Sequence, residues 1–282
     1  LSFDLAIEIG RFRRHVNDLF CSNKSKEKII DFINNYLYVD SNAANSIFEY
    51  FDEQFNYSEI PSNSRIIVEH YTDDKGKKYS MFHSLYGRRV NDCLSRALSY
   101  AISRTQHRDV EIGINDNGFY IASNKGVNVI RALKLLKSKE FFDVMNTAIE
   151  KSEILKRRFR HCAGRALMIL RRYKGREKRV GRQQVSSMIL MSAVKRINPD
   201  FCILKEARRE VLEDLMDMPN AKKILEGVEK KKVKIKEVTT KIPSPFAFNL
   251  ITQSFTDIMK IEDKAEFIRR MHKMIKAKIS IS

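Results

Sequence analysis

The chain has 282 residues, with 53 Lys and Arg against 35 Asp and Glu, which gives a formal net charge of +18. Its hydrophobic content of 43% is enough to build a core, so full disorder is excluded. No apolar run reaches the roughly 18 residues of a membrane span and no signal peptide opens the chain, so we expect a cytoplasmic protein with no membrane partner. The chain begins with Leu1, which suggests a segment of a longer protein. Four widely spaced cysteines argue against a disulfide scaffold and a zinc ribbon.

The positive charge is concentrated in one part of the chain. Residues 1–64 carry 6 basic and 10 acidic residues, whereas residues 151–182 carry 13 basic and 2 acidic residues. The second segment therefore holds more than half of the net charge. A local excess of this kind produces a field that attracts a polyanion.

The N-terminal part has the pattern of helices. Apolar residues recur every three or four positions over 5–20 and 29–37, and Ser41 is predicted to cap a third helix over 43–55. We therefore predict an acidic helical subdomain over residues 1–64, followed by one interwoven unit over residues 65–282.

The pattern next changes to that of strands. Residues 65–71 and 79–83 flank a glycine-containing turn, and residues 110–114 and 119–122 flank another, so two β-hairpins are predicted. A late strand is predicted over 232–239. Further helices are predicted over 87–103, 126–136, 140–149, 153–172, 183–196, 204–216, 221–228, 246–259 and 265–278. The predicted fold class is α+β, mostly helical, with a small antiparallel sheet or β-barrel built from the two hairpins and the late strand.

The basic helix and the connector that follows it, residues 153–182, form the strongest candidate site. On a helix continued to residue 172, Arg157, Arg160 and Arg171 would share one side. Nine of the 13 basic residues between 151 and 182 are Arg, which binds phosphate through two parallel hydrogen bonds. The alternative is a solvated basic face, or arginines paired with the acidic N-terminal part. The predicted nucleic-acid-binding residues are Arg88, Arg89, Arg157, Arg158, Arg160, Arg165, Arg171, Arg172, Lys174, Arg176, Arg179, Arg182 and Gln183.

Three other segments each admit two interpretations. Arg88 and Arg89 open a helix after a strand, where they either bind a phosphate or form an exposed turn. The lysines of residues 230–236 either guard a sheet edge, which we favour, or form a second binding surface. Phe246, after Pro243-Ser-Pro, is interpreted as structural, with base stacking as the alternative.

Catalytic and metal-binding patterns are missing from the sequence. Asp52-Glu53 lacks the preceding strand and the upstream Gly-x-x-x-x-Gly-Lys loop of an ATPase. The six histidines are scattered without metal-ligand spacing, and His161 and Cys162 are neighbours that point about 100° apart on a helix. We therefore expect no catalytic residue and no metal site in this chain.

Several segments resemble Lhr-type (large helicase-related) helicases of superfamily 2. The run from Leu155 to Gln184 is similar to the segment that follows the motor in these helicases, and Phe82-His-Ser-Leu-Tyr-Gly-Arg-Arg-Val-Asn91 is similar to their strand-to-helix signature. Asp4–Arg14 and Pro243-Ser-Pro-Phe246-Ala follow in the same order, and the basic run matches the archaeal branch better than the bacterial one. The chain has no Trp, so any stacking wedge made by tryptophan in relatives would need Phe or Tyr here.

The resemblance implies the region after the motor and the winged helix. We therefore expect a non-catalytic nucleic-acid-binding module of an ATP-dependent helicase, whose partners are single-stranded or tailed DNA or RNA and the motor and winged-helix domains of the same parent chain. ATP and magnesium are expected in the motor domains, with no cofactor in this segment. Two alternatives remain: a stand-alone nucleic-acid hydrolase of the nuclease or base-excision type, and an interaction platform for a protein or ribonucleoprotein.

Overall fold

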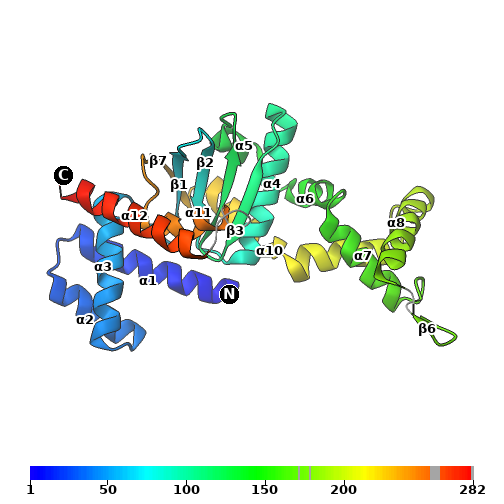
Figure 1. Ribbon diagram of the computed structural model, residues 1–282, viewed down its shortest axis with the longest axis horizontal. Helices are drawn as coiled ribbons and strands as arrows, with labels where there is room; N and C mark the ends of the chain where they lie inside the picture. The colour runs from blue at the N-terminus through cyan, green and yellow to red at the C-terminus, as the bar shows by residue number, and fades with distance from the viewer. Residues whose placement is uncertain (171, 178, 255–260, 281–282) are drawn as a thin grey trace.

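The structure, a computed structural model, describes residues 1–170, 172–177, 179–254 and 261–280. A central sheet separates two helical regions (Figure 1). The N-terminal helices and the C-terminal helix lie on one side of the sheet, and an arm of helices extends from the other side. The molecule is therefore elongated, and the basic segment lies in the arm.

The N-terminal region is a three-helix unit with its own core. It contains α1 (Phe3–Cys21), α2 (Lys26–Leu37) and α3 (Ser41–Tyr57). Phe12, Phe20 and Phe48 are among the side chains buried between these helices. The predicted helices are confirmed, but the cap of α3 is Asp40, whose Oδ1 accepts a hydrogen bond from Ala43 N at 2.7 Å. Asp40 carries a better-placed acceptor than the predicted Ser41, which is the first residue inside the helix.

The sheet is mixed and open. Its strands are β1 (Arg65–Thr72), β2 (Lys78–His83), β3 (Glu111–Asn115), β4 (Gly118–Ser123) and β7 (Lys234–Thr239). Their order is β3-β4-β2-β1-β7, so both hairpins and the late strand do share one sheet. The expectation of a purely antiparallel sheet or a β-barrel is wrong, because β7 pairs in parallel with β1 and leaves β3 and β7 as two separate edges.

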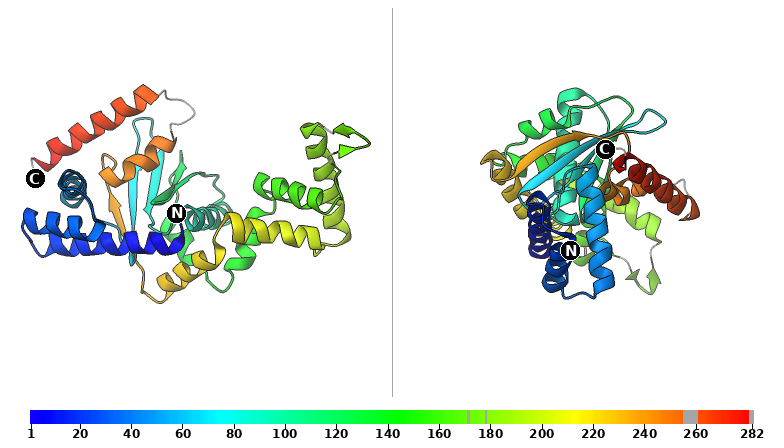
Figure 2. Two further views of the ribbon diagram at one scale, coloured as in Figure 1. Left: turned by 90° about the horizontal axis from the view of Figure 1, so that it is seen from below. Right: turned by 90° about the vertical axis from the view of Figure 1, so that its left-hand side faces the viewer.

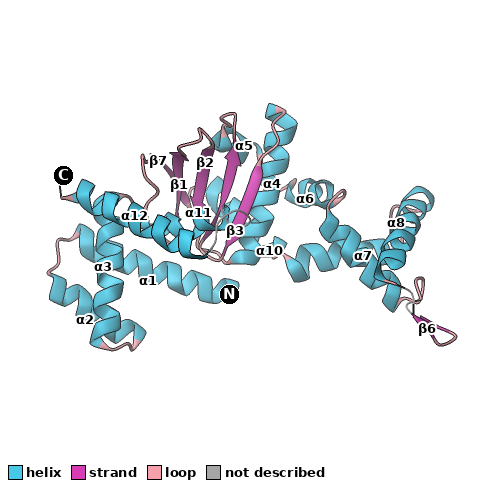
Figure 3. Cartoon of the chain, in the orientation of Figure 1, coloured by secondary structure: helices cyan, strands magenta, loops and turns pink. Residues whose placement is uncertain are grey.

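Helices cover both faces of this sheet (Figure 3). On one face, α4 (Arg88–Gln106) packs against apolar residues of alternating strand positions such as Val68, Phe82 and Ile121. On the other face, α11 (Phe248–Ser254) packs against Met81 and its neighbours. The mostly helical α+β class is thereby confirmed.

A buried polar network joins the late segment to the sheet. Glu69 of β1 is fully buried, and its Oε2 lies 2.8 Å from His83 Nε2 on β2 and 2.6 Å from Ser244 Oγ. Thr240 Oγ1 and Ser244 N donate to its Oε1 at 2.8 and 2.7 Å. Burial alone would raise the pKa of Glu69, but the hydrogen bonds from His83 and Ser244 outweigh burial and lower that pKa. Each buried polar atom of the carboxylate is therefore satisfied.

The segment that follows Ser244 packs against the N-terminal helices. The short 3₁₀ helix η2 (Pro245–Ala247) places Phe246 in the core of the three-helix unit. The Phe246 ring lies 4.6 Å from Tyr50 and beneath the Arg13 guanidinium at 4.7 Å. Phe246 is 5% exposed, so the structural interpretation holds and base stacking would require this core to open.

The remaining helices are α5 (Val129–Leu135), α6 (Phe141–Ile149), α7 (Glu153–Arg165), α8 (Val180–Ile197), α9 (Cys202–Arg209), the π-helical turn η1 (Glu210–Leu215), α10 (Met218–Glu229) and α12 (Ile261–Ile279). Of these, α5 and α10 pack against α4 beside the sheet, α6 to α9 and η1 build the arm, and α12 lies at the C-terminal end (Figures 1 and 2). Among the described residues, no helix combines the length and the apolar character needed to cross a membrane.

Candidate nucleic-acid interface

The basic helix is shorter than the sequence indicates. Ser152 caps α7 through its hydroxyl, and the helix ends at Arg165 instead of continuing to residue 172. Leu167 adopts a positive φ of 58°, and the amides of the next two residues turn back to bond the Ala163 carbonyl. This turn buries Ile169, which is 6% exposed. Tertiary packing therefore overrides a run of good helix formers, and the predicted continuation of the helix to residue 172 is wrong.

The predicted connector is a small β-hairpin. Strands β5 (Arg172–Tyr173) and β6 (Arg176–Glu177) pair antiparallel. The two residues between them, Lys174 and Gly175, have φ values of 49° and 72°, the signature of a type I′ turn. The dipeptide Lys-Gly between two short charged segments was the sequence signal for this hairpin. The hairpin projects from the end of the arm (Figure 2).

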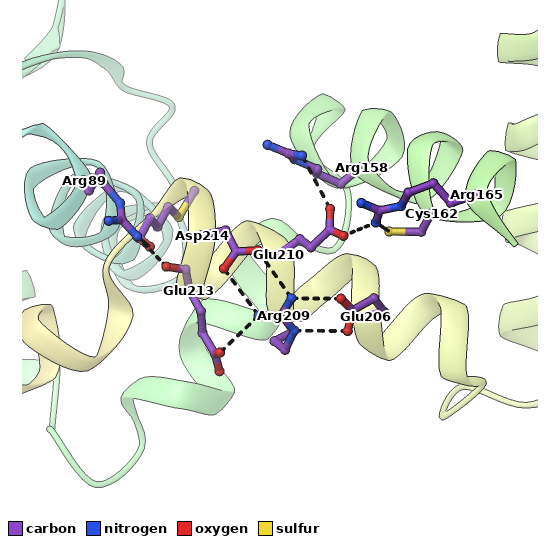
Figure 4. Close-up of polar contacts among 10 residues, drawn as sticks. Arg89, Arg158, Cys162, Arg165, Glu206, Arg209, Glu210, Glu213 and Asp214 are labelled. Carbon is purple, nitrogen blue, oxygen red and sulfur yellow. Dashed lines mark hydrogen bonds and ion pairs between the residues drawn. The ribbon is translucent and has the colours of Figure 1, made fainter.

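Two arginines of α7 are neutralised by one buried carboxylate (Figure 4). Glu210, at the start of η1, is 4% exposed and accepts hydrogen bonds from Arg158 at 3.4 Å and from Arg165. The contact with Glu210 raises the pKa of Arg165. Their bonds to Glu210 hold α7 against the α9–η1 segment, so Arg158 and Arg165 have a structural partner within the chain.

Two other arginines of α7 keep their charge uncompensated. Among the residues that the structure describes, Arg157 and Arg160 make no ion pair and no hydrogen bond through their side chains. Both line a groove of about 460 Å³ between α7 and α8. Lys156 stands on the same wall and is paired with Glu153 at 2.5 Å. The facing wall of α8 presents Gln184, Val185, Ser187 and Met188.

Arg157 also lines a second cavity on the other side of α7. This cavity, of about 630 Å³, lies between α7 and the ends of α4 and η1. Its lining residues are Asp92, Ile154, Arg157, Arg158, His161, Arg165, Leu215 and Met216. Arg157 is exposed and lines both of these basic cavities.

The hairpin and the start of α8 carry further residues of the predicted site. Arg172 and Lys174 lie in the hairpin and Arg176 lies in β6. Arg179 precedes α8, and Arg182 and Gln183 lie in its first turn. Arg179 and Arg182 are exposed, and within the described parts of the chain they have no ion pair. Arg171 lies outside the described residues.

Arg88 and Arg89, at the start of α4, form hydrogen bonds with other parts of the chain. Arg88 N donates to Asp116 Oδ1 at 3.2 Å, so an acidic side chain of the chain occupies this helix N-terminus. Arg89 Nη2 donates to the carbonyls of Glu213 and Met216 at 2.5 and 3.2 Å, which ties α4 to η1 (Figure 4). A phosphate at this helix start would have to displace Asp116.

Cys162 and Glu53, considered from the sequence as possible catalytic residues, are both engaged in packing. Burial and the nearby Glu210 charge raise the pKa of Cys162, so its thiol is a poor nucleophile. Across the described ranges, no three His, Cys, Asp or Glu side chains gather as a metal site would need. Glu53 of α3 accepts a hydrogen bond from His272 of α12 at 2.8 Å, which gives this acidic residue a packing role.

The role of Glu210, the carboxylate that pairs with two of the arginines of α7, was not predicted from the sequence. Glu210 lies 45 residues after Arg165 along the chain, and only the packing of α9 and η1 against α7 brings the two together. Glu210 lies three residues after Ala207 and directly before Val211, at the edge of the apolar face of the predicted helix 204–216, and this position was the available signal that a buried cation would face it.

The chain matches one family model and several curated helicases. Residues 60–247 match the family model described as DEAD/H associated. The ATP-dependent helicase Lhr-Core of Methanothermobacter thermautotrophicus is 51% identical over 98% of this chain, and that of Methanocaldococcus jannaschii is 35% identical over 100% of it. In both cases the match covers 32% of the relative, so the chain spans about a third of their length.

A solved structure has the same fold. The structure of Mycobacterium smegmatis helicase Lhr bound to ssDNA and AMP-PNP superposes with a TM-score of 0.76 at 25% identity. The superposition covers 89% of this chain and 31% of that one. Most of this chain therefore shares its fold with part of that helicase.

Proposed function

Because the chain belongs to the DEAD/H associated family and corresponds to the helicase-associated region of Lhr-type helicases, we propose that it is a nucleic-acid-binding module of a longer ATP-dependent Lhr-type helicase. Its role is to hold the phosphate backbone of single-stranded or tailed DNA or RNA. The match to archaeal Lhr-Core helicases along nearly the whole chain and the ssDNA in the similar structure support this proposal.

The groove between α7 and α8 carries the proposal. One wall presents guanidinium groups of Arg157 and Arg160 that no carboxylate of the described residues neutralises, and the other presents apolar and amide side chains such as Val185 and Gln184. Guanidinium groups bind phosphate oxygens, and apolar surface contacts sugars and bases. A single strand fits this division because its phosphates and bases point to opposite sides.

The test replaces the two unpaired arginines. Arg157→Gln with Arg160→Gln is expected to lower the affinity for a labelled single strand at least tenfold, as about two phosphate contacts are lost. The slope of log K against log salt should become shallower by about 1.4, at about 0.7 per phosphate. Fluorescence anisotropy titrations over a salt series, on DNA and on RNA, measure both quantities.

A matched control removes the same charge elsewhere. Arg104→Gln with Arg131→Gln changes two exposed arginines of α4 and α5 that line neither arm cavity. This variant should retain the wild-type slope. If both variants change the slope equally, the change is caused by the lower net charge and the groove is not the contact surface.

We also infer that the module is non-catalytic and that ATP and magnesium are bound by motor domains elsewhere in the longer protein. The raised pKa of Cys162 and the lack of a metal-ligand cluster among the described residues support this inference. Incubation of the chain with a labelled strand, with and without magnesium, should give no cleaved or base-excised product.

The outer face of α8 is our candidate contact for the motor or winged-helix domain of the same longer protein. Ile189 and Ile197 line neither arm cavity and are 66% and 83% exposed. No acidic residue occurs from 178 to 199, whereas Arg182 and Arg196 lie on the same helix. A surface of this composition favours a partner that is apolar at its centre and acidic at its border.

A further inference from the structure

A further basic cavity lies at the sheet edge, away from the two cavities of the arm. It has a volume of about 360 Å³ and is formed by α1, by the segment before β1 and by the start of β7. We call it the basic notch. Its lining residues are Arg14, Asn17, Asp18, Ser62, Ser64, Arg65, Lys232 and Lys234. Three stretches far apart in the sequence thus supply four cations and one acid to one hollow.

The parallel pairing of β7 with β1 builds the notch. Arg65 pairs with Lys234 in the ladder, and Lys234 N donates to the Ser64 carbonyl at 2.9 Å. Because side chains alternate along extended backbone, Val233 and Ile235 turn toward the core while Lys232 and Lys234 stay exposed. An antiparallel late strand in the same place would present a different set of side chains.

The cations of the notch differ in how they are used. Arg65 is committed to the fold, because its Nη2 donates to Asn17 Oδ1 and to the Ile60 carbonyl and its Nη1 lies 3.4 Å from Glu59. In contrast, Lys232 and Lys234 form no ion pair with any residue that the structure describes. Their positive charge is therefore available to a ligand.

Arg14 and two serines complete the binding chemistry. Arg14 Nε lies 4.0 Å from Asp18 Oδ2, the longest of the ion pairs here, and both side chains are more than half exposed, so this contact holds the guanidinium weakly. Ser62 Oγ and Ser64 Oγ stand 3.5 Å apart at the same cavity. Flexible cations beside hydroxyl groups are the donors that phosphate oxygens accept from.

We propose that the basic notch binds a phosphate group of the nucleic acid, as a contact separate from the α7–α8 groove. This proposal rests on the proposed function, since it assumes that the chain holds a nucleic acid. Protection of the sheet edge by lysines explains the sequence run less well. Lys236, farther along the same edge, is neutralised by Glu59, whereas the two lysines that line the cavity are left unpaired.

Strand β7, which lines the notch, is the edge strand farthest from the arm, whereas α7 and α8, which line the groove, lie within the arm (Figure 1). A nucleic acid that touches both must therefore pass along the molecule and not only over the arm. The notch should accordingly contribute to the affinity for long strands, and not to the affinity for oligonucleotides too short to reach from the arm to the notch.

The experiment replaces the two unpaired lysines. Lys232→Gln with Lys234→Gln should make the salt slope for a long single strand shallower by about 1.4 and leave the slope for a very short oligonucleotide unchanged. The control, Lys222→Gln with Lys223→Gln, removes the same charge from exposed positions of α10 that lie outside the notch. Thermal unfolding followed by circular dichroism verifies that each variant folds. Arg14→Gln is a further test of the notch, because it removes one of the lining cations without changing strand β7.

Three outcomes separate this inference from the proposed function. If the notch variant behaves as its control does on the long strand, the notch is not a phosphate site, whatever the groove does. If Arg157→Gln with Arg160→Gln has no effect, the groove proposal fails even where the notch variant weakens binding. When both proposals hold, combining the two pairs of substitutions should lower the slope additively, by about 2.8.

Discussion

The sheet and the arm differ in how completely their charged side chains are paired. In the sheet, Glu69 is fully buried, and His83, Thr240 and Ser244 satisfy its oxygens. In the arm, Glu210 neutralises two arginines, but Arg157 and Arg160 on the same helix find no acid among the described residues. Balanced buried charges specify how segments pack, whereas unbalanced exposed charges cost folding energy unless a ligand compensates them. The difference separates the part that holds the fold from the part that we propose binds.

The largest effect is expected in the sheet network. Glu69→Gln removes a buried charge that faces His83 and should lower the free energy of unfolding by about 3 kcal/mol. Urea denaturation followed by circular dichroism measures the change. The control is Glu237→Gln, which breaks the more exposed ion pair with His70 and should cost less than about 1 kcal/mol.

This effect should also depend on pH. The pKa of Glu69 in the folded protein lies below the ordinary glutamate value of 4.5, so the network stabilises the fold above that pH and loses its contribution as pH falls through the folded pKa. The stability difference between wild type and Glu69→Gln should therefore be constant near neutral pH and shrink below about 4.5. A difference that grew in acid would show that the carboxylate is destabilising.

An intermediate effect on stability is expected at Glu210, which is a buried and paired carboxylate of the arm as Glu69 is of the sheet. Glu210→Gln leaves Arg158 and Arg165 without their counter-ion, which should lower stability by about 1–3 kcal/mol and raise the affinity for a single strand. The control Glu206→Gln removes the same charge from an exposed pair with Arg209. Equal affinities of the two variants would mean that the released arginines do not reach the strand.

The smallest effect on stability is expected at the outer face of α8. Ile189→Ser with Ile197→Ser should change the free energy of unfolding by less than about 0.5 kcal/mol, because both side chains are exposed. The same variant should bind more weakly to a fragment that carries the motor and winged-helix domains, as measured by calorimetry. Unchanged binding would remove this face as their contact.

Local patterns in the sequence predicted most of the elements but not their limits in the arm. The hairpins and the N-terminal helices have strong periodicity and clear turn residues, and the structure has them at nearly the predicted positions. The run after Arg165 has good helix formers and no proline, so no local signal ends α7 there. The burial of Ile169 ends it, and this depends on contacts that no short window contains.

The composition and the charge pattern by themselves determined that this chain carries a concentrated basic segment, a helical N-terminal region and strands enough for one sheet. The tertiary structure alone decided which cations are available, because an ion pair depends on which distant residues pack together. Glu210 reaches α7 across 45 residues, and β7 reaches α1 and β1 to form the notch. Charge is a property of the chain, but its neutralisation is a property of the fold.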